Sequence, residues 1–267
     1  MAGRERPHAR RLHCAGLMEA MDERDYHDAH YAGAASAIEA GALFQRVHER
    51  AVRQFLSRAA ITSTHRVLSL GCGDASIEIR LARHVGELVG VDISSVAIEN
   101  ARARAAGIGN VSFVVSESGR PRIEELGAFD AVVAFAFLHH LSDPAVAETL
   151  SSARKALRRG GVFYSVDPSR RRFVRLFTWL VREAYDKYHS PDERELEPDV
   201  LVQLALEAGF SRPKVSYSDY FLGPLAWLAP RAPRPLAAAL EVLDSSALRV
   251  PLVRRYASSF SLLAYAS

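Results

Sequence analysis

The sequence predicts an α/β fold in which helices flank a doubly wound, mostly parallel sheet of seven strands. Short apolar runs rich in valine, leucine and phenylalanine alternate along the chain with segments whose apolar residues recur at helical spacing. This alternation is typical of βαβ units, in which a helix joins two parallel strands. Several apolar runs end in glycines, histidines or carboxylates, which places polar groups at the carboxyl edge of the sheet, where α/β proteins bind their ligands.

Each expected element of the first half follows from its local pattern. A long amphipathic helix is expected over about 34–60, because apolar residues from Ile38 to Leu56 recur at helical spacing. Ser94 or Ser95 is expected to cap a later helix, which Gly107 ends. The first half also contains expected strands over about 66–70, 87–92 and 111–115, and helices over about 75–85 and 94–106.

The second half continues the alternation and adds two cap segments. Pro198 opens a helix that Gly209 ends. The added segments cover about 169–197, after the fifth strand, and about 221–256, between the last two strands. The expected strands of this half cover about 129–135, 161–166, 214–220 and 259–265.

The composition fits one domain. The chain has 267 residues, of which 49% are hydrophobic, enough to bury one large core. We expect an N-terminal tail and possible lid over 1–33 and a single domain over 34–267. Its two cysteines, Cys14 and Cys72, cannot form a disulfide framework, which favours a cytoplasmic location. No uninterrupted apolar run reaches the ~18 residues of a spanning helix, and a net charge of +3 does not indicate a nucleic-acid surface.

A glycine pair and an acid at the ends of neighbouring strands carry the strongest functional signal. The run Val67–Leu70 leads into Gly71 and Gly73, and the next strand ends at Asp92. Glycines let the backbone approach a ligand closely, and an acid in this position can receive ribose hydroxyls. A dinucleotide fingerprint needs a third glycine where this chain has Ser76. The pattern therefore favours an adenosine-containing ligand other than a dinucleotide.

Later motifs extend this pattern in a fixed order. The third apolar run ends at Ser116 and Glu117, a Leu-His-His-Leu turn follows the fourth, and a Gly-Gly pair precedes the fifth. Over about 60–220 the sequence resembles the class I S-adenosylmethionine (SAM) dependent methyltransferases, and among them the broad ubiquinone and menaquinone C-methyltransferase group. The resemblance implies a Rossmann-like methyltransferase fold whose last two strands form an antiparallel hairpin. It also implies SAM as cofactor and S-adenosylhomocysteine (SAH) as product.

The resemblance further implies which residues contact the cofactor. The glycine turn and Asp74 would surround the methionyl part, Asp92 the ribose and Glu117 the adenine. Ser69 stands where the family often has an acid that organises the methionyl amino group, and Ala75 replaces a frequent glycine. The expected cofactor residues are Gly71, Cys72, Gly73, Asp74, Asp92, Ile93, Ser116, Glu117 and Phe135.

Two neighbouring histidines are the candidate catalytic groups. His139 and His140 follow the fourth strand at the ligand-binding edge. A histidine there could take a proton from a phenol, an enol or a carbon acid at neutral pH. Alternatively, His140 only fills the turn and hydrogen-bonds to the backbone. No cysteine or acid stands at metal-ligand spacing beside them, so no metal site is expected.

Aromatic side chains outside these motifs are candidates for the acceptor site. In similar enzymes an N-terminal segment folds over SAM and the acceptor, which makes Tyr26, His27 and Tyr31 candidate lid residues. Tyr185 and Tyr188 of the first added segment could line the same pocket. Because both added segments are apolar, we expect a lipophilic pocket, or a surface that meets a membrane or a partner.

These observations lead to one main hypothesis. It is a SAM-dependent O- or C-methyltransferase acting on a lipophilic small molecule, such as a quinone, a polyketide or another secondary metabolite. The alternatives are a catalytically silent SAM-binding or regulatory protein and an RNA or protein methyltransferase, whereas the missing glycine disfavours a dehydrogenase. Peripheral membrane contact and a homodimer stay open, and no nucleic-acid partner is expected.

Overall fold

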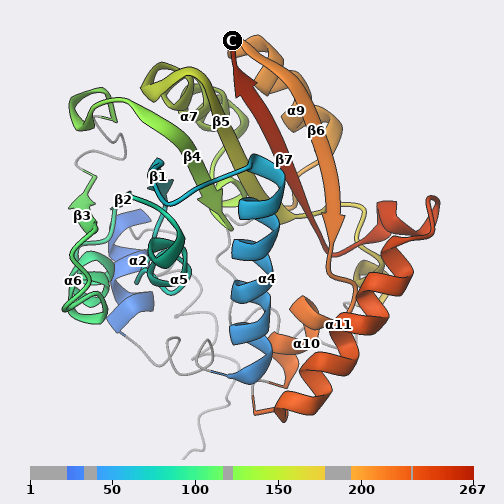
Figure 1. Ribbon diagram of the computed structural model, residues 1–267. Coiled ribbons are helices and arrows are strands. Elements are labelled where there is room, and N and C mark those ends of the chain that lie inside the picture. The colour runs from blue at the N-terminus through green and yellow to red at the C-terminus, as the bar shows by residue number, and fades with distance from the viewer. Residues whose placement is uncertain (1–22, 33–40, 117–122, 178–193, 230) are drawn as a thin grey trace, which may run out of the picture.

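The centre of the molecule is a sheet of seven strands in the order β3-β2-β1-β4-β5-β7-β6 (Figure 1). The computed structural model describes residues 23–32, 41–116, 123–177, 194–229 and 231–267. Neighbouring strands from β3 to β5 are parallel, whereas β7 lies antiparallel between β5 and β6. The predicted fold class and terminal hairpin are therefore confirmed. The strands are β1 (Arg66–Leu70), β2 (Glu87–Asp92), β3 (Val111–Val115), β4 (Phe129–Phe135), β5 (Leu157–Pro168), β6 (Phe210–Ser218) and β7 (Ser259–Ala266).

Two strands begin earlier than the sequence predicts. β5 starts at Leu157, before the Gly-Gly pair, because this residue already pairs with Phe129 across an irregularity in the register. β6 starts at Phe210 because that residue pairs with Ala266 near the end of β7. Both extensions lie at the amino end of β5, opposite the edge that carries the candidate site.

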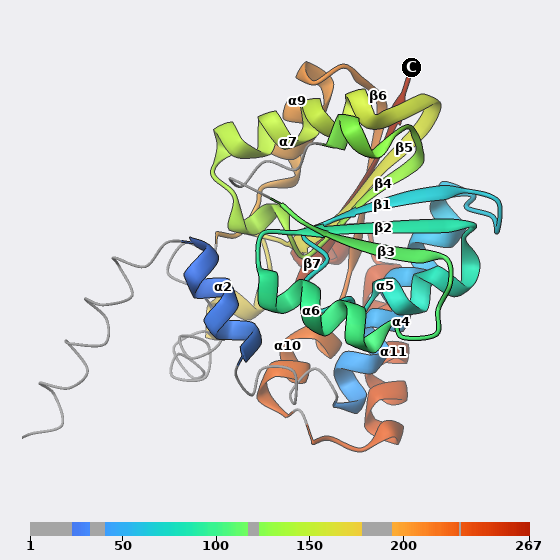
Figure 2. The same cartoon turned by 90° about the vertical axis from the view of Figure 1, so that its left-hand side faces the viewer.

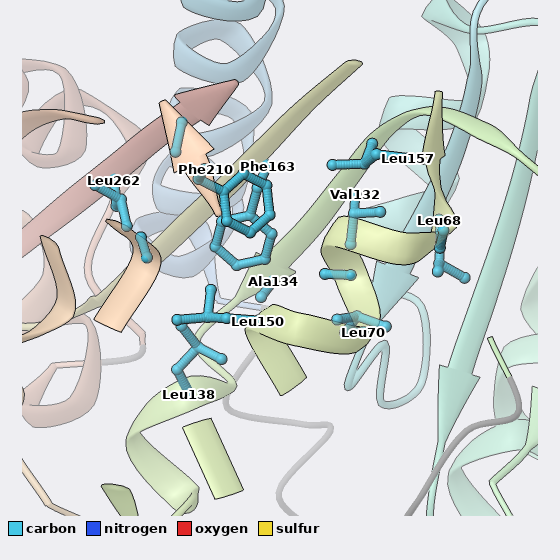
Figure 3. Close-up of a cluster of buried hydrophobic side chains, with 14 of the residues drawn as sticks. Leu68, Leu70, Val132, Ala134, Leu138, Leu150, Leu157, Phe163, Phe210 and Leu262 are labelled. Atoms are coloured by element: carbon cyan, nitrogen blue, oxygen red, sulfur yellow. The ribbon is translucent and has the colours of Figure 1, made fainter. Parts of the chain in front are cut away.

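Both faces of the sheet are covered, which explains why its central strands are apolar at almost every position. On one face Leu68 and Phe163 belong to a cluster with Leu150, part of which Figure 3 shows. Two helices, α7 (Asp143–Ala156) and α9 (Pro198–Glu207), close this face. The apolar runs of the sequence therefore correspond to strands that are buried on both sides.

The opposite face carries α4 (Ala42–Ala59), which buries Phe55 against Tyr164 with ring centroids 5.3 Å apart. α6 (Ser95–Arg104) packs on β2 and β3, and Ser94 caps it as predicted, because its Oγ accepts a hydrogen bond from Ala97 N at 3.0 Å. The long first helix of the prediction is thus present as α4, and 34–40 lie outside the described residues.

The helix after β1 is shorter than predicted. Ala75 has φ +63°, a left-handed conformation that the interior of an α-helix does not allow. Helix α5 (Glu78–Leu81) therefore begins only after it, and the chain continues as the 3₁₀ turn η1 (Ala82–His84). The same φ explains why a glycine would suit position 75.

The insertion between β6 and β7 forms a helical unit beside the carboxyl edge of the sheet, next to α4 (Figure 1). Phe44 of α4 packs on Trp227 with ring centroids 4.8 Å apart. Arg50, also of α4, pairs with Asp219 at 2.6 Å and with Asp244 at 3.1 Å. Apolar packing and a buried charge cluster thus fix the unit to α4. Its elements are α10 (Leu222–Leu228), α11 (Arg234–Leu248) and the 3₁₀ turn η6 (Val253–Tyr256).

The remaining described elements are one helix and three short turns. α2 (Glu23–Ala32) packs on α6 (Figure 2). The segment predicted as a helical cap after β5 is, in its described part, the 3₁₀ turn η5 (Phe173–Phe177), and 178–193 lie outside the described residues. The other short turns are η3 (Ile123–Leu126) and η4 (Leu138–His140).

Candidate active site

A cavity of about 350 Å³ lies at the carboxyl ends of β1, β4 and β5. Its walls come from the loop after β1, from η4, and from α2, α4 and α10. The cavity therefore connects the expected cofactor turn with the apolar insertion. The expected site residues on its wall are Tyr26, His27, Tyr31, Gly71, Cys72, Gly73, Asp74, Phe135, His139 and His140.

The two glycines after β1 occupy positions that other residues would not tolerate. Gly71 has φ +63° and Gly73 has φ +52°, in the left-handed region. A Cβ atom at Gly71 would lie 2.2 Å from the Phe137 ring, and one at Gly73 would lie 2.3 Å from the Tyr31 hydroxyl. Cys72 between them is buried among the side chains of α6 and β3, which raises the pKa of its thiol and indicates a packing role.

Asp92 at the end of β2 is joined directly to this turn. Its Oδ2 accepts a hydrogen bond from Gly73 N at 2.8 Å, and its Oδ1 accepts one from Ser94 N at 2.9 Å. Burial raises the pKa of the Asp92 carboxyl, while these backbone donors oppose the shift. The fold thus brings together the glycine turn and the acid that the sequence indicated.

Two further carboxylates follow the glycines. Asp74 accepts hydrogen bonds from Ser76 N and Oγ and pairs with Arg104 at 2.7 Å. Glu78, at the start of α5, accepts a 2.7 Å hydrogen bond from Ser69 Oγ and lines the cavity. Burial raises the pKa of Glu78 to about 7. Sequence reasoning missed Glu78, although the serine at position 69 was a signal that a different acid could serve this part of the site.

Helix α2 is fixed over the ends of β2 and β3. Asp28 accepts a hydrogen bond from Ser94 Oγ at 2.5 Å and another from Val96 N at 3.3 Å. Arg24 donates to the Ser116 carbonyl oxygen at 3.3 Å. Ser116, Ile93 and Asp92 lie in this region, and none of them is on the cavity wall. Three expected site residues, Glu117, Tyr185 and Tyr188, lie outside the described residues.

The histidines of η4 lie beside an acid that the sequence did not single out. His139 is 7% exposed, and its Nδ1 lies 3.3 Å from Oδ1 of Asp167, near the end of β5. The same oxygen accepts a hydrogen bond from His139 N at 3.2 Å. The ring of His140 lies 4.1 Å from that of His139, and His27 of α2 contacts His140 edge-on. A neutral His139 with its proton on Nδ1 would leave Nε2 as an acceptor.

The part of the cavity wall that comes from α4 and α10 is mainly apolar, although Arg50 and Gln54 of α4 also line it. His48 of α4 is an exception: it is 8% exposed, and its Nδ1 has no hydrogen-bond partner among the described residues. Burial, together with two nearby arginines, lowers the pKa of His48 to about 4, so the ring is neutral at physiological pH. Sequence reasoning treated this helix only as a core element. The apolar lining residues of the cavity include Phe44, Val47, Val174, Pro224, Trp227 and Leu228.

No three histidine, cysteine or acidic side chains within the described ranges gather as metal ligands would. The histidines of η4 and α2 therefore do not indicate a metal site within these ranges. What the arrangement offers is a proton acceptor beside a mixed polar and apolar cavity.

The fold and the site together define a class of protein. A glycine turn tied to the acid of the neighbouring strand, in a sheet with an antiparallel last strand, is an arrangement for binding an adenosine-containing cofactor. Residues 67–161 match a family model described as a methyltransferase domain.

Known proteins agree with this class. The chain is 29% identical over 188 residues to carboxy-S-adenosyl-L-methionine synthase from Campylobacter curvus, covering 63% of this chain and 79% of that protein. It is 33% identical over 152 residues to magnesium-protoporphyrin O-methyltransferase from Rhodobacter capsulatus, covering 56% and 64%. The structure of magnesium protoporphyrin IX methyltransferase from Synechocystis PCC 6803 with bound SAH covers 91% of this chain and 98% of its own, with a TM-score of 0.60 and 15% identity. Residues 67–161 thus match a methyltransferase domain, and the chain has the fold of the magnesium protoporphyrin IX methyltransferase structure.

The residues present fit SAM. The two glycines line the cavity without side chains of their own, and two carboxylates lie next to the turn: Asp92 accepts a hydrogen bond from Gly73 N, and Glu78 accepts one from Ser69. A ligand with ribose hydroxyls and a cationic amino group is the kind that such a set of acceptors would bind.

Proposed function

We propose that the chain transfers a methyl group from SAM to an oxygen or carbon atom of a lipophilic small molecule that must lose a proton, such as a quinol, a polyketide phenol or another secondary metabolite. The observation that carries this proposal is the His139–Asp167 pair on the wall of the same cavity as the glycine turn. The apolar wall from α4 and α10 supports a lipophilic acceptor. So does the similarity to a relative named magnesium-protoporphyrin O-methyltransferase.

The chain's own residues would align the acceptor and remove its proton. SAM supplies an activated methyl group, so the reaction needs positioning and water exclusion more than further activation. His139 Nε2 would take the proton of the acceptor as the new bond to the methyl group forms and the sulfur–methyl bond breaks, leaving SAH. Asp167 would hold the His139 ring through Nδ1 and stabilise the imidazolium that results.

A transfer assay tests this proposal. The purified chain is incubated with SAM carrying a deuterated methyl group and a panel of phenols, quinols and carboxylated macrocycles, and products are detected by mass spectrometry. We expect the label in at least one lipophilic acceptor. SAH binding with no transfer to any member would favour the silent SAM-binding alternative, which the loss of the usual acid at Ser69 supports. Labelled RNA or protein instead would favour the third hypothesis.

Replacing Asp167 by asparagine is expected to lower kcat for the accepted substrate by about 10²–10⁴-fold, because the amide neither fixes the ring nor stabilises its charge. The KM and the Kd for SAH should change by less than about threefold, since the hydrogen bonds of Asp167 among the described residues go to His139 and not to the glycine turn. The matched control is Asp130→Asn, an acid of β4 at the amino end of the sheet, which should keep the wild-type kcat. Equal kcat values for Asp167→Asn and the wild type would contradict the assignment of His139 as the base.

We also propose that the insertion docks on an anionic membrane surface, from which a lipophilic acceptor can enter. None of the described helices is long and apolar enough to span a bilayer. Large apolar side chains are nevertheless exposed on this unit, including Val242 at 66% and Leu252 at 78%. The same unit carries exposed arginines that form no ion pair with another described residue, whereas Glu241 is paired with Arg46 and Asp244 is buried. These arginines are Arg231, Arg234, Arg249, Arg254 and Arg255.

The double variant Arg254→Ser, Arg255→Ser is expected to weaken sedimentation with phosphatidylglycerol vesicles by about tenfold or more, because each arginine near an anionic surface contributes about 1 kcal/mol. Neutral phosphatidylcholine vesicles should bind the wild type weakly. The control is Arg102→Ser, Arg212→Ser, which removes two exposed arginines from other faces. Equal vesicle binding by the two double variants would contradict membrane docking. So would a wild-type chain that forms dimers but does not sediment with the vesicles.

A further inference from the structure

Glu78 is a buried carboxylate on the cavity wall with no cationic partner among the described residues. Glu78 is 3% exposed, and the one side chain that hydrogen-bonds to its carboxylate among the described residues is Ser69, whose hydroxyl donates at 2.7 Å. Burial is the main cause of its raised pKa, and the charges of Asp74 and Asp92 add to it. A buried carboxylate without a cation is costly to a folded protein and is therefore a candidate for binding a ligand cation.

The other carboxylates of the cavity wall are already engaged. Asp74 pairs with Arg104, and Asp219 pairs with Arg50. Asp167 uses Oδ1 to accept a hydrogen bond from His139 N and lies beside the ring of His139, while its Oδ2 has no partner among the described residues. Glu78 is thus the cavity carboxylate that no basic side chain of the described residues contacts: its partners are the Ser69 hydroxyl and its own backbone.

The position of Glu78 limits which cation it can meet. Ser69 is the residue of β1 that lies two positions before Gly71, so the Glu78 carboxylate lies next to the strand that leads into the glycine turn. A metal ion is not indicated, since no cluster of three suitable ligands exists in the described ranges. A primary ammonium group offers three donors and one charge, which a carboxylate and a hydroxyl can receive together.

We propose that Glu78, oriented by Ser69, binds the α-ammonium group of the methionyl part of SAM. This inference rests on the proposed function, because it assumes that SAM occupies this cavity. It means that an acid from α5 takes the place of an acid in β1: Ser69 supplies the hydroxyl and Glu78 supplies the charge.

Calorimetric titration with two ligands tests the proposal. One is SAH, and the other is its deamino analogue, in which hydrogen replaces the α-amino group. Glu78→Gln is expected to weaken SAH binding by about 10–100-fold, the usual size of a lost charge-assisted hydrogen bond. Binding of the deamino analogue should change by less than about twofold. Glu99→Gln, an exposed acid of α6, is the control and should leave both titrations unchanged.

Ser69→Ala provides a second variant in case Glu78→Gln does not fold. It keeps the charge but removes the hydroxyl, and we expect an SAH-specific loss of about three- to tenfold. An equal loss for both ligands, or no loss for either, would overturn the role of Glu78 while leaving the cofactor site intact. A wild-type chain that binds neither ligand would instead overturn the proposed function.

Discussion

Replacing Asp92 by alanine is expected to weaken SAH binding by at least about 100-fold. A carboxylate that accepts hydrogen bonds from two ribose hydroxyls contributes about 1.5–3 kcal/mol for each, and 1.4 kcal/mol corresponds to tenfold in affinity. In this chain the loss has a second cause. Asp92 also accepts the hydrogen bond from Gly73 N, so its removal takes away a contact that fixes the glycine turn. Calorimetric titration with SAH measures the effect.

Asp130→Ala is the matched control for this variant. Asp130 also accepts a hydrogen bond from the backbone of β1, at Arg66 N and 2.8 Å, but at the amino end of the strand. Both variants therefore remove an acid that holds β1 or the loop after it, and only one faces the proposed cofactor site. Asp130→Ala should bind SAH within about twofold of the wild type. Similar losses in the two variants would mean that Asp92 acts only through the fold.

Replacing Asp244 by alanine is expected to lower the free energy of unfolding by about 3–5 kcal/mol, because it leaves Arg50 as an incompletely paired buried charge. Asp244 is fully buried, and its Oδ2 lies 3.1 Å and 3.2 Å from Nη1 and Nη2 of Arg50. Its Oδ1 also accepts hydrogen bonds from Tyr220 N and Phe221 N, before α10. Urea unfolding followed by circular dichroism measures the loss.

Two other variants separate the causes. Asp244→Asn keeps an acceptor for the backbone of α10 but removes the charge, so its loss should lie between those of the wild type and Asp244→Ala. Asp199→Ala removes the surface pair with Arg171, where the side chain of Asp199 is 78% exposed, and should cost about 1 kcal/mol or less. If Asp244→Ala costs no more than Asp199→Ala, the charge cluster does not hold the insertion.

The fold was largely predictable because its signals are local. Glycines and polar residues bound the apolar runs, so five strands have the predicted limits within a residue, and Ser94 caps α6 as expected. Departures occur where pairing or backbone strain overrides the local pattern. Ala75 ends the turn in a left-handed conformation and shortens α5, and Leu157 joins β5 through its pairing with Phe129.

The site was predictable only where its residues belong to a motif. Gly73 and Asp92 are both motif positions, and the parallel sheet brings Gly73 N to 2.8 Å from Asp92 Oδ2. By contrast, the residues that pair with the candidate base and with the insertion belong to no motif. Asp167 of β5 lies beside His139, which follows β4. Asp219 pairs with Arg50, which lies 169 residues earlier in the chain. Such pairs depend on tertiary packing, which cannot be predicted from the local spacing of residues in the sequence.

The most direct test of the account is amide hydrogen exchange of the wild-type chain with and without saturating SAH. The account predicts slower exchange in the presence of SAH at 71–76 and 92–95, the glycine turn and the start of α6, with a smaller effect in α2, which packs on α6. The amides of α7 and α9, on the other face of the sheet, should exchange at unchanged rates. Unchanged exchange at the glycine turn, or protection confined to α10 and α11, would contradict a cofactor site at this edge of the sheet.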